Sequence, residues 1–151
     1  MWNELLTVIF LTMLPIAELR GGIPVGLALG LSPWIVILTA IIVNCLVFFP
    51  IYFILDIFYD RFFSRFAWTR KLIDNVQRRG GKYVEKYGII GLALFVGIPL
   101  PVTGVWTGTG AAWFLGLDWK RSFLAICLGV LISSTIVSII SLGIINGFAS
   151  V

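Results

Sequence analysis

The sequence carries little charge, and this scarcity limits where the protein can fold. Of its 151 residues, 60% are hydrophobic and only 12% are charged, and the mean hydropathy is +1.06. A chain with so little polar side-chain area cannot cover the surface of a globule in water. The composition therefore excludes an ordinary soluble domain and predicts an integral membrane protein.

The residues that metal proteins and many enzymes need are also scarce. There is no histidine, and the two cysteines, Cys45 and Cys127, lie within apolar tracts where a thiol packs as a small hydrophobic group. No phosphate-binding glycine loop, dinucleotide-binding motif or nucleophile elbow follows an expected strand. We therefore expect no metal site, no cofactor, no enzyme activity and no nucleic-acid partner.

The charge that is present is concentrated in one segment. Eight of the 11 Lys and Arg residues lie between Asp60 and Tyr87. By the positive-inside rule this loop is cytoplasmic, and the protein belongs in the cell membrane, of the cytoplasmic or inner type. Apolar residues recur within the loop at roughly helical spacing. The segment Arg61–Lys86 is therefore predicted to hold an interfacial helix that binds anionic lipid headgroups.

Charge-free tracts on both sides of this loop predict an all-α membrane domain with two similar halves, residues 1–59 and 88–151. Each half has a broken apolar segment followed by an unbroken one that exceeds the about 20 residues needed to cross a bilayer. The expected spans are 33–59 and 120–148. This shared order predicts a repeat. A residue suited to capping a helix N-terminus precedes each span: Ser32 and Asp118.

The broken segments predict re-entrant hairpins. Residues 2–31 are interrupted by Pro15–Pro24, and residues 88–117 by Gly97–Gly104. If 88–117 enters the membrane from the cytoplasm, turns and returns, the basic pair Lys120-Arg121 stays inside, as the charge rule favours. The same shape in the first half makes the halves inverted repeats with both termini outside. Two such tips can meet at mid-membrane around a cavity.

The tip of the first hairpin holds Glu18 and Arg20, the only charged residues between Leu5 and Leu55. Charged side chains at membrane depth are costly and usually functional. Glu18 is the candidate for proton coupling, because a carboxyl group can change its protonation state whereas arginine stays protonated. The alternatives are an internal Glu18–Arg20 ion pair that fixes the turn, or a hairpin that is only a surface loop.

Arg20 is the candidate for binding an anionic headgroup at the same tip. Its guanidinium is expected to act with free backbone N–H groups of a turn formed by Gly21, Gly22 and Pro24. The second tip carries no charge, so backbone and hydroxyl groups must supply its contacts. The alternative for the glycines of both tips is close helix packing, because they recur at small-xxx-small spacing. The candidate binding residues of the second tip are Pro99, Pro101, Thr103, Gly104 and Thr107.

Two segments, Glu18–Pro24 and Pro99–Gly110, resemble the small multidrug export protein-like family, and the similarity covers essentially the whole chain. The chain is also similar to the DedA/VTT superfamily, of which it looks like a distant, minimal member. That resemblance implies two opposed re-entrant hairpins, a lipid substrate such as a polyprenyl phosphate, and Glu18 as the acidic residue of the first hairpin. The second tip lacks the arginines that DedA proteins have there, so Arg20 would supply the positive charge.

These features predict a secondary, proton-coupled transporter in which opposed hairpins expose Glu18 and Arg20 alternately to the two sides of the membrane. The substrate would be a lipid or another amphipathic anion. One alternative is an exporter of lipophilic drugs or cations by proton antiport, against which Arg20 weighs. Another is a non-transporting membrane assembly or scaffold protein. Two complete spans in 151 residues also favour a homodimer.

Overall fold

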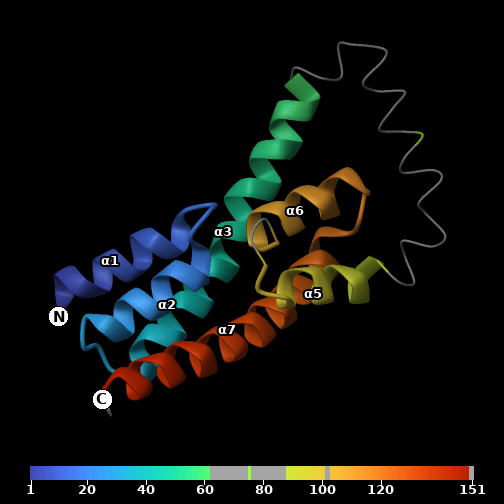
Figure 1. Ribbon diagram of the computed structural model, residues 1–151. Coiled ribbons are helices and arrows are strands. Elements are labelled where there is room, and N and C mark those ends of the chain that lie inside the picture. Colours follow the sequence, from blue (N-terminus) through green and yellow to red (C-terminus); the bar gives the residue numbers. More distant parts are fainter. Residues whose placement is uncertain (62–74, 76–87, 101–102, 150–151) are drawn as a thin grey trace.

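The computed structural model describes residues 1–61, 75, 88–100 and 103–149 (Figure 1). Within these ranges every regular element is a helix, which confirms the all-α class. The interfacial helix and lipid contacts expected for the Arg61–Lys86 segment fall almost wholly outside the described residues. The six helices of the described ranges are α1 (Trp2–Met13), α2 (Glu18–Ala28), α3 (Pro33–Arg61), α5 (Ile89–Gly97), α6 (Val105–Phe114) and α7 (Trp119–Ala149).

Helices α3 and α7 are long and apolar enough to cross a membrane. Each contains a 27-residue apolar stretch, of which 18 consecutive residues have a mean hydropathy of 2.5. At a rise of about 1.5 Å per residue such a stretch is about 40 Å long, against about 30 Å for the hydrocarbon core of a bilayer. The expected spans, 33–59 and 120–148, match these helices closely. The Asp118 carboxylate caps α7 as predicted, accepting hydrogen bonds from the Lys120 and Arg121 N–H groups at 3.0 Å each.

The shorter helices form two hairpins, α1–α2 and α5–α6, whose tips face each other in the middle of the molecule (Figure 1). Within the halves, α1 packs against α2 and α5 packs against α7. The second arm of each hairpin also crosses to the other half, so that α2 contacts α7 and α6 contacts α3. This reciprocal exchange brings the tips together, and both ends of the chain lie at one end of the molecule.

The arms of the first hairpin pack closely because glycines face the neighbouring helices. A Cβ atom at Gly22 would overlap the Thr12 hydroxyl on α1. A Cβ atom at Gly26 would lie 2.7 Å from Val8 of α1 and 2.8 Å from Val36 of α3, closer than carbon atoms normally pack. The small-xxx-small pattern of the first hairpin therefore mediates close helix packing.

The first break is shorter than the sequence predicted. Helix α2 already begins at Glu18, so Gly21, Gly22 and Pro24 lie inside a helix rather than in a turn. The Gly21 N–H donates to the Ala17 carbonyl at 2.9 Å and is therefore not free for an anion. A helix interior disfavours glycine by about 1 kcal/mol and proline by about 3 kcal/mol. That cost is offset because a helix satisfies its own backbone groups in apolar surroundings, and because one stripe is buried: Leu19, Ile23 and Leu27.

The second break lies where it was predicted. Helix α5 ends at Gly97 and α6 begins at Val105, and the intervening chain is not helical where it is described. Pro101, one of the candidate binding residues, lies outside the described residues. The Thr103 hydroxyl lies 2.7 Å from the carbonyl oxygen of Ile98 and so braces this tip.

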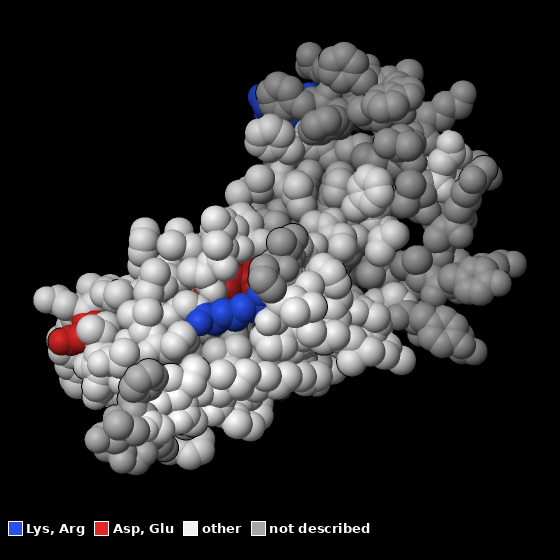
Figure 2. Space-filling view, in the orientation of Figure 1, with Lys and Arg blue, Asp and Glu red and all other residues white. Residues whose placement is uncertain are grey.

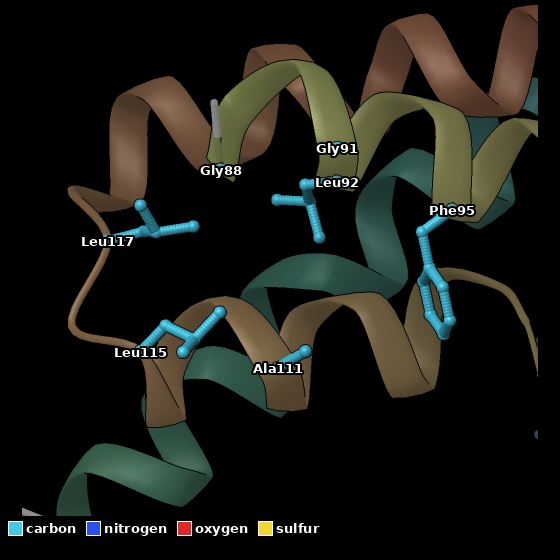
Figure 3. Close-up of a pocket in the computed structure, with 7 residues that line it drawn as sticks. All are labelled: Gly88, Gly91, Leu92, Phe95, Ala111, Leu115 and Leu117. Atoms are coloured by element: carbon cyan, nitrogen blue, oxygen red, sulfur yellow. The ribbon is translucent and has the colours of Figure 1, made fainter. Parts of the chain in front are cut away.

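A cavity separates the arms of the second hairpin. It has a volume of about 240 Å³, and Leu92 and Phe95 of α5 point into it, toward α6 (Figure 3). Ala111 and Leu115 line the opposite side. Helix α5 packs mainly on α7, where Gly129 allows the two backbones to approach closely. Near the tip, by contrast, the two arms touch, because a Cβ atom at Gly108 of α6 would lie 2.6 Å from Val96 of α5. The arms of the second hairpin are therefore close at the tip and separated by the cavity farther from it.

Candidate functional site

The two hairpin tips meet at one place, which we call the hairpin junction. It consists of Glu18 and Arg20 from the first hairpin and Thr103, Gly104 and Trp106 from the second. On the face shown in Figure 2, the described surface is almost wholly uncharged, except near the ends of the molecule and at a central place where a red and a blue group meet. The junction is therefore the place to look for chemistry that needs charge.

Glu18 lies at the start of α2, and its side chain crosses to the start of α6. Its Oε1 atom accepts a hydrogen bond from the Trp106 N–H at 3.3 Å, and only 5% of the residue is exposed. The start of a helix favours a carboxylate, because its first N–H groups are unpaired and the helix dipole is positive there. The Glu18 backbone has a φ of 45°, a left-handed conformation that costs a residue other than glycine about 1–2 kcal/mol. Contacts with the second hairpin offset that cost.

Gly104 makes room for this carboxylate. A Cβ atom at position 104 would overlap the carboxylate of Glu18, so a larger residue would force the carboxylate or the second tip to move. Gly104 directly precedes α6, and its carbonyl oxygen accepts the Gly108 N–H at 2.8 Å. The absence of a side chain at Gly104 therefore allows the two tips to make contact.

Arg20 makes the second contact across the junction. Its Nη2 atom donates to the carbonyl oxygen of Thr103 and to the Thr103 hydroxyl, the latter at 3.0 Å. The residue is half-buried, and its Nε atom is buried with no hydrogen-bond partner among the described residues. A buried donor left without a partner costs about 1–3 kcal/mol. The guanidinium therefore keeps one donor unused while the two tips are in contact.

Glu18 and Arg20 do not pair with each other, since no ion pair joins them in the part of the chain that the structure describes. Each side chain bonds to the second hairpin instead, Glu18 at Trp106 and Arg20 at Thr103. The sequence left open whether the two charges fix their own turn. Their observed partners give them a different role, which is to hold one hairpin tip against the other.

Trp106 belongs to the junction, although the sequence patterns did not single it out. Besides its backbone bond to Glu18, its indole Nε1 donates to the carbonyl oxygen of Met13 at 3.3 Å. An aromatic residue two positions after the Gly104 turn was the available signal. Trp106 also lines a cavity of about 470 Å³ between α3 and α6. This cavity is formed by Met13, Val47, Pro50, Ile51, Ile54, Leu55, Trp106 and Gly110.

The remaining candidate residues lie around the junction rather than in it. Gly21, Gly22 and Pro24 are inside α2, and Pro99 is half-buried at the second tip. Thr107 lies in α6, and its hydroxyl donates to a backbone carbonyl oxygen at 3.4 Å. Among the described residues, no group of three His, Cys, Asp or Glu side chains could hold a metal ion. The junction thus offers one carboxylate, one guanidinium, a hydroxyl and backbone groups.

A family of known proteins matches most of the chain. Residues 18–136, which include every residue of the hairpin junction, match the profile described as putative small multi-drug export protein, a transporter rather than an enzyme. No curated protein and no solved structure matches the chain. The family and the two helices of membrane-spanning length together point to a membrane protein. The chain belongs to the family of putative small multi-drug export proteins.

Proposed function

We propose that the protein is a proton-coupled secondary transporter that moves an amphipathic anion, such as a polyprenyl-phosphate-like lipid, across the cell membrane. The observation that carries the proposal is the hydrogen bond between Glu18 and the Trp106 N–H. It joins an acidic side chain deep within the apolar part of the chain to the backbone of the opposite hairpin. Proton binding at Glu18 would therefore act directly on the contact between the two tips.

The proposed coupling follows from the charge of the carboxylate. An ionised Glu18 accepts a strong, charge-assisted hydrogen bond and is favoured by the N-terminus of α6. A protonated Glu18 loses both advantages, so the junction weakens when the side chain faces the more acidic side. Arg20 then provides the other link, through Thr103. An anionic group that binds the guanidinium would compete with that link and let the tips separate.

We further propose that the two halves are inverted repeats with re-entrant hairpins, as in the DedA/VTT superfamily. The reciprocal packing of α2 on α7 and of α6 on α3 supports this arrangement. The position of both chain ends at one end of the molecule supports it as well (Figure 1). In this topology the Asp60–Tyr87 loop faces the cytoplasm and binds lipid headgroups, and the termini lie outside. A homodimer belongs to the same proposal, because each chain supplies only two long spans.

Flux measurements in liposomes test this function. Purified protein would be reconstituted, a pH gradient imposed, and the uptake of a labelled long-chain alkyl phosphate measured. We expect driven uptake by the wild type and none by Glu18→Gln, which keeps the shape of the side chain but cannot release a proton. Asp56→Asn, a change outside the junction, is the control and should behave as the wild type. Full pH-driven uptake by Glu18→Gln would remove Glu18 as the proton carrier.

A second candidate, export of lipophilic cations by proton antiport, is favoured by two observations. The description of the family names multi-drug export. The residues that line the cavity between α3 and α6 have apolar side chains, apart from the indole of Trp106. Arg20 argues against a cation, because its positive charge lies at the junction. Driven transport of tetraphenylphosphonium but not of the alkyl phosphate would favour this candidate. Lack of driven flux of both would favour an assembly or scaffold protein.

A further inference from the structure

The cavity between α3 and α6 has the dimensions of a ligand site. Sites for small molecules commonly have volumes of about 300–1,000 Å³. The cavity between α3 and α6, at about 470 Å³, lies within that range, whereas the cavity inside the second hairpin, at about 240 Å³, lies below it. The wall on α3 is the stretch around Pro50, and the wall on α6 is formed by Trp106 and Gly110. The larger cavity is therefore the better candidate for a bound molecule.

This cavity is accessible from the outer surface of the helices. Two of its lining residues, Met13 and Ile54, are 51% and 55% exposed. In a membrane protein, exposed apolar side chains of this kind face lipid tails, which are as apolar as leucine. A molecule would thus enter sideways from the bilayer. Such a route suits a hydrocarbon group and excludes a hydrophilic solute.

Two residues connect the cavity to the hairpin junction. Trp106 lines the cavity, and its backbone N–H donates a hydrogen bond to Glu18. Met13 also lines the cavity, and its carbonyl oxygen accepts the hydrogen bond of the Trp106 indole. A molecule in the cavity would therefore touch the same turn of α6 that holds the coupling carboxylate. At the junction, Arg20 offers a positive charge and an Nε donor without a partner among the described residues.

We propose that this cavity holds the hydrocarbon part of an amphipathic anion whose charged group lies at the junction with Arg20. The inference rests on the proposed function, since it names the place where the apolar part of the substrate binds. Because Trp106 is shared, occupation of the cavity and the Glu18 hydrogen bond depend on each other. The residue thereby acts as a positioning residue between the substrate and the proton site.

Binding to this cavity can be probed with tetraphenylborate and tetraphenylphosphonium. These two hydrophobic ions have nearly equal size and shape but opposite charge. Their equilibrium binding to the purified wild type would be compared with binding to Gly110→Leu. A Cβ atom at Gly110 meets nothing within 4 Å, so leucine can fill the cavity without moving the backbone. Gly91→Leu is the matched control, because that position is equally open but lines the smaller cavity (Figure 3). Ile54→Trp fills the larger cavity from α3 if Gly110→Leu does not fold.

We expect the wild type and Gly91→Leu to bind tetraphenylborate, and Gly110→Leu to bind it about tenfold more weakly, equivalent to about 1.4 kcal/mol. Tetraphenylphosphonium should bind weakly to all three. Unchanged binding to Gly110→Leu, an equal loss in both variants, or no binding to the wild type would overturn the proposal. Tighter binding of the phosphonium would overturn its anionic assignment.

The binding measurement uses no gradient, and it therefore separates this inference from the proposed function. Weaker binding by Gly110→Leu, combined with no driven flux in the wild type, would support the cavity as a binding site and refute proton-coupled transport. Driven flux in the wild type, combined with unchanged binding by Gly110→Leu, would support transport and refute the cavity as the substrate site.

Discussion

The two hairpins contribute to one junction in opposite ways. The first presents the charges of Glu18 and Arg20, and its arms are so close that Gly22 leaves no space for a Cβ atom. The second offers backbone and hydroxyl partners, and a cavity separates its arms beyond the close contact of Gly108 with Val96. The first hairpin is thus tightly packed and charged. The second is less tightly packed and supplies the uncharged partners of those charges. This difference predicts that motion during transport lies mainly in the second hairpin.

The largest effect is expected from Gly104→Ala, which adds a methyl group where the Glu18 carboxylate lies. Either the carboxylate or the second tip must move. We therefore expect loss of driven transport and a destabilisation of about 1–3 kcal/mol, as at other overpacked sites. Gly143→Ala is the matched control, because its Cβ atom would meet nothing within 4 Å and it lies on α7, outside the junction and the cavity. Flux and thermal unfolding check both variants, and identical behaviour of the two would disprove the close contact at Gly104.

Arg20→Lys should have the next largest effect. Lysine keeps the charge but lacks the planar fork, and a single compact ammonium replaces the group that reaches two oxygens of Thr103. A hydrogen bond to a charged group contributes about 1.5–3 kcal/mol, so we expect binding of an alkyl phosphate to weaken roughly tenfold or more. Glu18→Gln should still bind the alkyl phosphate but lose driven transport. An unchanged affinity in Arg20→Lys would mean that the anion binds elsewhere.

Trp106→Phe should have a smaller effect, because it keeps an aromatic ring, although it removes part of the indole and the N–H that bonds to Met13. The loss of one neutral hydrogen bond lowers stability by about 0.5–1.5 kcal/mol. Trp113→Phe removes a comparable indole bond, to Asp56, outside the junction. We expect both variants to lose similar stability, and only Trp106→Phe to slow driven transport. Equal transport rates would show that the indole does not connect the two hairpins functionally.

Gly91→Leu should have the smallest effect on the fold and tests the looseness of the second hairpin directly. Replacing a glycine within a helix raises stability by about 0.5–1 kcal/mol, and the new side chain occupies part of the cavity between the arms. We expect a small gain in thermal stability and slower transport with unchanged substrate binding. Gly143→Leu, at an open position on α7, provides the comparison. Transport by Gly91→Leu at the wild-type rate would indicate that transport does not require the cavity between the arms of the second hairpin.

Local patterns predicted the parts of the fold that depend on neighbouring residues. Uninterrupted apolar stretches predicted α3 and α7, and the position of Asp118 predicted the cap of α7. The start of α2 was misplaced, because the glycines and Pro24 indicated a turn. Burial of one helix face outweighed those propensities, and burial depends on the whole fold rather than on the local sequence.

The contacts of the junction could not be predicted in the same way. Arg20 and Thr103 are 83 residues apart, and Glu18 and Trp106 are 88 residues apart. In both contacts the partner includes a backbone group, which every residue possesses. The sequence indicated that Glu18 and Arg20 were functional because charge is rare around them, but it carried no sign of which backbone groups they bind. Trp106 was missed for this reason.

The central claim, that proton binding at Glu18 opens the junction, is tested most directly by a distance measurement between the tips. Spin labels would be attached at Ile16 and Ile98, which are 94% and 50% exposed, in protein whose native Cys45 and Cys127 are replaced by serine. Distance distributions would then be recorded from alkaline to acidic pH. We expect one short distance at alkaline pH, a growing longer component on acidification, and the longer component at every pH in Glu18→Gln. A wild-type distribution that stays the same across this range would contradict the claim.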